Sequence, residues 1–148
     1  MENDIYQFEF RDFRLLSIHF ELKNNKEYKP TKDVRVSTVL SLKHDLLKDK
    51  KRLRLFMKLD ICGDELPFSL GAEVGGLFVF PKTIKNASSL DKVARINCAA
   101  IVFPYLREIV ADITRRANLP ILNLPPVNFV ENYQSRRTTK TKQLSKEG

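Results

Sequence analysis

The chain has 148 residues, 43% of them hydrophobic, and a formal net charge of +8 at pH 7. This size predicts one domain with a real core, and the longest apolar run, Ala99 to Pro104, is far too short to cross a bilayer. The acidic start, Met1 to Asp4, lacks the basic and then apolar order of a signal peptide, so we expect a cytoplasmic protein without membrane insertion.

The N-terminal segment alternates apolar and polar residues from Tyr6 to Leu22, and the alternation slips out of register near Arg11 to Phe13. Successive side chains of a strand point to opposite faces, so this alternation predicts a first strand with one buried face.

Two further alternating runs predict a hairpin. One begins at Val34 and Val36 and reaches Lys43, and the other extends from Arg52 to Ile61. The turn between them is a basic cluster, Lys48 to Arg54, which is either a solvated turn or a site for anionic partners.

A fourth run, Phe68 to Phe80, is interrupted by Gly75 and Gly76, where we expect a bulge or a close backbone approach. Consecutive strands with short links and half-polar faces predict an antiparallel meander rather than βαβ units.

The period then becomes helical. Ser88 is the expected N-cap, with Asp91 completing a capping box, and Asn118 suits a left-handed C-cap. Pro104 lacks an amide hydrogen and is expected to kink or restart the helix. The apolar positions at helical spacing are Leu90, Val93, Ile96, Ala100, Leu106, Ile109, Val110 and Ile113.

Three prolines make Leu119 to Pro126 a stiff, extended connector, and a short last helix is expected from Phe129 to about Gln134. The fold class is therefore α+β: a four-stranded antiparallel sheet with a long kinked helix and a short C-terminal helix on one side. Residues 1–134 form the domain, and residues 135–148 are expected to be a disordered basic tail.

No catalytic motif occurs, and we expect neither an enzyme nor a cofactor. His19 and His44 are on different strands and lack the spacing of a metal site. Cys62 and Cys98 have no nearby cysteine or histidine partner, so we expect two buried, reduced thiols rather than a disulfide or metal ligands.

Two C-terminal blocks carry a resemblance. Ile101-Val102-Phe103-Pro104-Tyr105, followed by Leu106, Arg107 and Glu108, precedes the block Leu122-Asn123-Leu124-Pro125-Pro126-Val127-Asn128-Phe129. Together with Ile18-His19-Phe20-Glu21 and Gly75-Gly76-Leu77-Phe78, they resemble the SecB protein-export chaperone family over residues 5–133.

The resemblance implies an ATP-independent holdase that binds unfolded polypeptide and assembles as a homotetramer, a dimer of dimers. Leu70, Ala72 and Val74 match the family's subunit-assembly positions, and the alternative is an ordinary core face. The candidate lining of a client-peptide groove, which the alternative places in the core, is Phe103, Tyr105, Leu122, Leu124, Val127 and Phe129.

The charge pattern departs from that of the export chaperones. Their sheet and tail carboxylates dock the basic tail of the SecA motor, whereas here Glu21 is the one matching acid, Gly71 stands at another acidic position, and the tail is basic. The resemblance therefore implies two kinds of client: unfolded preproteins or, as in SecB-like proteins of toxin–antitoxin modules, an antitoxin. The alternatives are a basic nucleic-acid-binding module, for which the recognition motifs are missing, and a small-molecule or enzymatic α+β domain.

Overall fold

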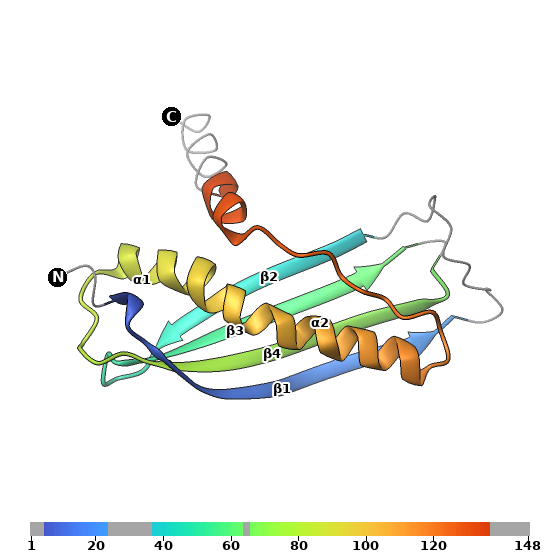
Figure 1. The fold of residues 1–148 in the computed structure, drawn as a ribbon, viewed down its shortest axis with the longest axis horizontal. Coiled ribbons are helices and arrows are strands. Elements are labelled where there is room, and N and C mark those ends of the chain that lie inside the picture. Colours follow the sequence, from blue (N-terminus) through green and yellow to red (C-terminus); the bar gives the residue numbers. More distant parts are fainter. Residues whose placement is uncertain (1–4, 24–36, 64–65, 137–148) are drawn as a thin grey trace.

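The computed structural model describes residues 5–23, 37–63 and 66–136. Four strands form one antiparallel sheet: β1 (Glu9–Leu22), β2 (Ser37–Leu46), β3 (Arg52–Cys62) and β4 (Phe68–Val79). A long helix lies across one face of this sheet (Figure 1). We refer to the face under the helix as the covered face and to the opposite one as the open face. The expected α+β architecture is confirmed, while the predicted strand positions Val34 and Val36 lie outside the described residues.

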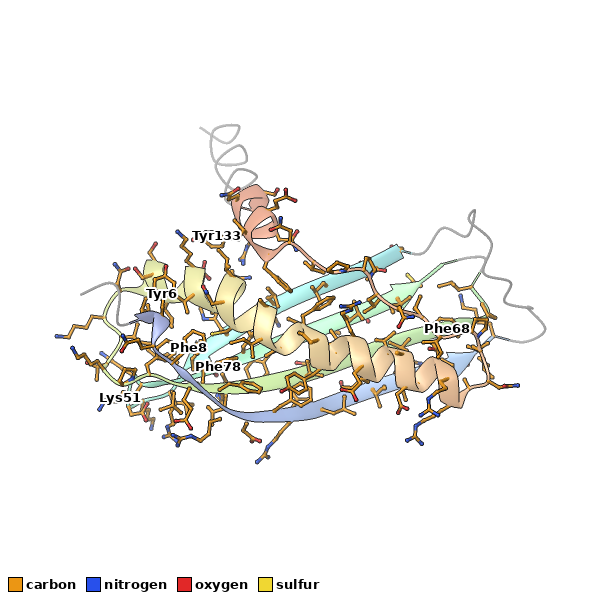
Figure 2. All side chains as sticks on the ribbon, in the orientation of Figure 1. Tyr6, Phe8, Lys51, Phe68, Phe78 and Tyr133 are labelled. Carbon is orange, nitrogen blue, oxygen red and sulfur yellow. The ribbon has the colours of Figure 1, made fainter. Side chains whose placement is uncertain are left out.

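The strand order is β1-β4-β3-β2. A meander of all four strands would place β1 beside β2, so that expectation holds for β2, β3 and β4 alone. β1 lies beside β4 because its apolar side chains pack there: the ring of Phe10 lies 5.1 Å from that of Phe78. Figure 2 shows Phe8, which precedes β1, next to Phe78 as well, with ring centroids 5.4 Å apart.

β1 contains two register shifts, one between Phe10 and Asp12 and one between Leu15 and Ser17. The first confirms the slip expected from the broken alternation. The second was not expected, and it turns the side chain of Leu16 to the open face, where a methyl carbon of Leu16 approaches Gly75. A bulge adds one residue to one strand and so redirects the next side chain.

The core lies between β3, β4 and the helix. Every second residue of β3 from Leu53 to Ile61 is buried, as its period of two predicts. Gly76 of β4 points to the helix, and a Cβ atom there would lie only 2.9 Å from Cγ2 of Val102. This confirms the close approach expected at the glycine pair, since the contact leaves no room for a side chain.

The long helix consists of α1 (Ala87–Val93), a π-helical turn (Ala94–Cys98) and α2 (Ala99–Arg116). α2 continues through Pro104 without restarting, and the irregular hydrogen bonding lies in the π-helical turn instead. A π-helical turn holds more residues than an α-helical one, so the buried stripe shifts. Ala94, Cys98 and Ala99 are buried, whereas Ala100 is exposed and Ile96 half-buried.

The predicted cap was wrong. Asn86 is the N-cap, and its side-chain oxygen accepts hydrogen bonds from the N–H groups of Ser88 and Ser89. An Asn side chain caps as well as Ser does, and Asn86 lies two residues before Ser88. Asp91 is thereby free for another contact: its Oδ1 lies 2.8 Å from Nε2 of His44 and 2.7 Å from Nε of Arg95, which joins the helix to β2.

Two expectations need smaller corrections. Cys98 is buried as predicted, but Cys62 is exposed because it ends β3 on the open face. The last helix spans residues 129–136, so Ser135 and Arg136 are helical rather than part of the tail. The rest of the predicted tail, residues 137–148, lies outside the described residues. Within the described ranges, no helix combines the length and apolar content needed to cross a membrane.

Candidate functional site

The connector after α2 begins at a left-handed cap. Ala117 is the C-cap of α2, and Asn118 after it has φ 59°, as expected for the left-handed residue that ends a helix. The N–H of Leu119 donates to the carbonyl of Thr114. The chain then turns back and runs beside the helix, across the covered face toward β2 (Figure 1).

Thr114 attaches the connector to the helix. Its side chain is fully buried, and its hydroxyl donates to the carbonyls of Val110 (3.1 Å) and Ala111 (3.0 Å). The same hydroxyl oxygen accepts the N–H of Leu122 at 3.0 Å. One side chain therefore satisfies a connector amide that has no partner in regular structure.

The far end of the connector is held by apolar contacts. Leu124 and Phe129 are buried, and the ring of Phe129 meets that of Phe103 edge-on at 5.7 Å. Leu122 and Val127 pack on the same cluster but are half-buried. Five of the six predicted groove residues therefore lie in or against the hydrophobic core, and Phe103 and Phe129 among them are in direct contact. The partly exposed ones among them are Leu122 and Val127.

Tyr105 lies apart from these five. Its ring stacks on Phe13 at 4.7 Å and lies 5.8 Å from Phe10, so it covers β1 rather than the connector. Two residues along an α-helix correspond to about 200° of rotation, which places Tyr105 and Phe103 on opposite sides of α2. Tyr105 remains 42% exposed.

A hollow of about 330 Å³ lies between α2 and the start of the connector. Its apolar wall includes Ile109, Ala111 and the 53% exposed Ile121. Its polar wall includes Asp112, which pairs with Arg116 and Arg115, and these hydrogen bonds hold the pKa of Asp112 below its ordinary value. The hollow therefore offers an apolar surface bounded by fixed charges.

Leu70, Ala72 and Val74, the residues predicted for subunit assembly, are buried beneath the helix within one chain. The exposed apolar side chains of the covered face lie on β1, at the edge of the sheet. Leu15, Ile18 and Leu22 are 47%, 38% and 53% exposed, and their partners on β4 are Val74, Ala72 and Phe68. We refer to Leu15, Ile18 and Leu22 as the β1 strip.

Glu21 is exposed on the open face, where its carboxylate lies 3.7 Å from His19. The register brings Asp60 of β3 opposite Gly71 and Glu73 of β4 opposite Ser17 on that face. Glu21, Asp60 and Glu73 are therefore three carboxylates on the open face, with Glu73 opposite Lys58 of β3. Asp60 and Glu73 were missed because only the strand pairing shows that they share a face with Glu21.

Thr114 and Ile121 were also missed in the sequence. Thr114 continues the i, i+4 series of Leu106 and Val110, both fully buried, so a polar residue on the apolar stripe was the available signal. Among the described residues, no three of the types His, Cys, Asp and Glu lie close enough to hold a metal ion.

A single antiparallel sheet, one long helix across it and a proline-rich connector over an apolar cluster define an α+β protein with one covered sheet face. The family model described as Preprotein translocase subunit SecB matches residues 10–140. The chain belongs to this family, whose members are non-enzymatic chaperones.

Individual SecB proteins are also similar to this chain in sequence. The Protein-export protein SecB of Idiomarina loihiensis is 28% identical over 142 residues, covering 90% of this chain and 82% of the relative. That of Paraburkholderia phymatum is 36% identical over 75 residues, covering 49% and 46%. For the first relatives found, the alignments cover 39% to 46% of the relative's own length.

The fold also matches a solved structure. A SecB-like chaperone of Mycobacterium tuberculosis, in complex with a ChAD peptide from the HigA1 antitoxin, superposes with a TM-score of 0.67. The match has 22% sequence identity and covers 83% of this chain and 92% of the other. At this identity the likeness establishes the shared fold.

Proposed function

We propose that this chain is an ATP-independent holdase that binds non-native polypeptide in the groove along the connector. The observation that carries the proposal is how the connector is held: Thr114 holds its start, and Phe129 against Phe103 holds its end. Between these points Leu122 and Val127 stay partly exposed. A stiff, apolar surface of this kind binds apolar side chains without reading a sequence.

Binding of a client does not require ATP hydrolysis. Burying one large apolar side chain of a client contributes about 1.5–3 kcal/mol, and several grooves in one assembly would bind one client chain with avidity. Binding to the unfolded state alone holds the client there by mass action. We place this activity in the cytoplasm, with unfolded preproteins or an antitoxin as the clients.

Aggregation of a denatured client tests the proposal. The double variant Leu122→Ser, Val127→Ser should lose most of the suppression of aggregation that the wild-type protein gives. Val39→Ser is the matched control, since Val39 is an exposed apolar residue of β2 on the open face. If the double variant and the control both protected the client as well as wild type, the groove assignment would be wrong.

We further propose that the chains assemble as a homotetramer, a dimer of dimers. Leu70, Ala72 and Val74 are covered within one chain, so the contact is assigned to the β1 strip, which is apolar and lies on an edge strand. Ile18→Arg should give a smaller species in light scattering, with Lys58→Glu on the open face as control. A tetramer that survives Ile18→Arg would contradict this assignment.

The partner that co-purifies with the chain distinguishes between an export role and a toxin–antitoxin role. Bound SecA would favour export, with Glu21, Asp60 and Glu73 as the docking carboxylates. A bound antitoxin would favour the toxin–antitoxin role that the printed name of the Mycobacterium tuberculosis complex describes for that protein. RNA as the bound species, lost at high salt, would overturn both in favour of nucleic-acid binding.

A further inference from the structure

The open face contains a second hollow, of about 340 Å³, far from the connector because the sheet lies between them. Its floor is formed by the apolar side chains of Leu16, Phe56 and Leu77. The other lining residues are Asp12, Arg14, Leu47, Arg54, Gly75 and Gly76. Residues of β1, β3 and β4, with Leu47, thus border an open hollow that has room for a large side chain.

The hollow exists because a side chain is missing at Gly75. Gly75 has no positive φ, so its backbone does not require glycine. A Cβ atom at this position would lie 3.2 Å from Cδ1 of Leu16, and the β1 bulge is what turns Leu16 toward it. An added side chain would therefore fill the space between β1 and β3. The hollow therefore results from the β1 bulge and Gly75 together.

Two guanidinium groups border the apolar floor. Arg54 pairs with Asp45 and lies over the ring of Phe56, with Cζ 5.8 Å from the ring centroid. Arg14 donates from Nε to Asp12 at 2.9 Å, and its side chain is 76% exposed. A guanidinium has five N–H donors, so Arg14 keeps several donors directed to solvent.

Charged side chains are unevenly distributed along the strands of the open face. Leu47 of the lining leads directly into the β2–β3 turn, where Lys48, Lys50 and Lys51 accompany the Asp49–Arg52 ion pair. Lys51 lies at the same end of the sheet as Phe8 and Phe78 (Figure 2). The carboxylates of Glu21 and Asp60 lie toward the opposite end, whereas Glu73 lies two residues from Gly75 on the same strand. The hollow is therefore nearer to the turn lysines than to Glu21 and Asp60.

We propose that this hollow binds an acidic segment of a partner protein through one large apolar side chain. The apolar side chain inserts between Leu16, Phe56 and Leu77, and flanking carboxylates of the segment meet Arg14 and Arg54. The turn lysines increase the rate of encounter with such a segment. A client of the connector groove binds on the other face of the sheet, so both sites can be occupied at once.

The composition of the floor favours a polypeptide over a nucleic acid. Sequence-tolerant binding of single strands depends on aromatic faces on which bases stack. Phe56 is the one aromatic residue of the lining, and the guanidinium of Arg54 already covers its ring. Leu16 and Leu77 offer aliphatic contacts that suit a Leu, Met or Phe side chain.

The test uses the full-length protein and a fluorescein-labelled peptide with a central phenylalanine flanked by glutamates. Anisotropy should give weaker binding by about fivefold or more for Arg14→Glu and for Leu77→Ser, and weaker binding of the wild type at high salt. Lys58→Glu is the matched control, because it makes the same charge change on the same face. Circular dichroism verifies that each variant is folded.

Two further arms decide the outcome. A peptide with serine in place of phenylalanine and one with lysines in place of glutamates should both bind more weakly than the acidic parent. The Leu122→Ser, Val127→Ser protein should bind the acidic peptide unchanged while losing the denatured client. Equal losses in Lys58→Glu and Arg14→Glu, or tighter binding of a single-stranded oligonucleotide than of the acidic peptide, would overturn the proposal.

Discussion

The hydroxyl of Thr114 accepts the N–H of Leu122 at 3.0 Å, eight residues further along the chain. Together with the hydrogen bond from the N–H of Leu119 to the carbonyl of Thr114, this bond links the last turn of α2 to the connector. Because Thr114 is fully buried, water cannot replace the bond without opening the packing around it.

Replacing Thr114 by Val keeps the shape but removes the acceptor. We expect the free energy of unfolding to fall by about 1–2 kcal/mol, because the N–H of Leu122 loses its partner. Amide hydrogen exchange should quicken in residues 119–124. Thr114→Ser keeps the hydroxyl and serves as the control. Unchanged exchange at Leu122 in the Val variant would show that the hydroxyl does not hold the connector.

Gly76→Ala should destabilise the fold. The new methyl carbon would lie 2.9 Å from Cγ2 of Val102 and 3.1 Å from the ring of Phe78, and overpacking of this kind costs about 1–3 kcal/mol. Urea denaturation measures the loss. Gly71→Ala is the matched control, since its nearest neighbour is the flexible, exposed side chain of Asp60, and the change should stay within about 0.5 kcal/mol. Equal midpoints for the two variants would contradict the close helix–strand contact.

Asp91 should contribute stability that is lost in acid. Partial burial acts to raise its pKa, but the hydrogen bonds from His44 and Arg95 outweigh this, so the pKa is below its ordinary value of 3.8. A lowered pKa in the folded state stabilises the protein above about pH 4, and this contribution is lost as the pH falls through the folded pKa.

Asp91→Asn should therefore lower the urea midpoint at pH 6, and the difference from wild type should shrink as the pH falls below 4. We expect the loss at pH 6 to be about 1 kcal/mol or less, since the carboxylate remains partly solvated. Asp45→Asn removes an exposed pair and is the comparison. A difference between wild type and Asp91→Asn that stays constant from pH 6 to pH 3 would rule out this role for the carboxylate.

The two thiols should differ in reactivity. Burial raises the pKa of Cys98 to about 12, so at pH 8 about one molecule in ten thousand carries the reactive thiolate there. Cys62 is exposed. A thiol reagent should modify one cysteine in the folded protein and both after unfolding. Cys62→Ser should leave the folded protein unreactive, and rapid modification of that variant would contradict the burial of Cys98.

Several features could be predicted from short-range patterns because neighbouring residues decide them. The period-two burial of β3, the slip at the start of β1 and the left-handed Asn118 were all visible in the order of residues. The helix cap shows the limit of such patterns. Asn86 and Ser88 are both capping residues, and hydrogen bonds to the N–H groups of Ser88 and Ser89 select Asn86.

The phase of the buried helical stripe could not be predicted in the same way. A constant helical period leads from Val93 to Ile96 and Ala100, whereas the π-helical turn moves burial to Cys98 and Ala99. The turn is set by packing on the sheet, which a local pattern does not contain. The position of Tyr105, in contrast, could have been predicted from the sequence. Helical geometry alone places Tyr105 and Phe103 on opposite sides of the helix.

The order of residues by itself determined which segments are strands, helix and connector, and its two C-terminal blocks indicated the chaperone family, because these properties depend on neighbours along the chain. The tertiary structure alone decided that β1 lies beside β4, that Thr114 holds Leu122, and that Leu16 and Gly75 leave a hollow on the open face. Each of these contacts joins residues that are distant in the sequence. Such contacts are fixed by close packing of the whole sheet, which local patterns do not contain.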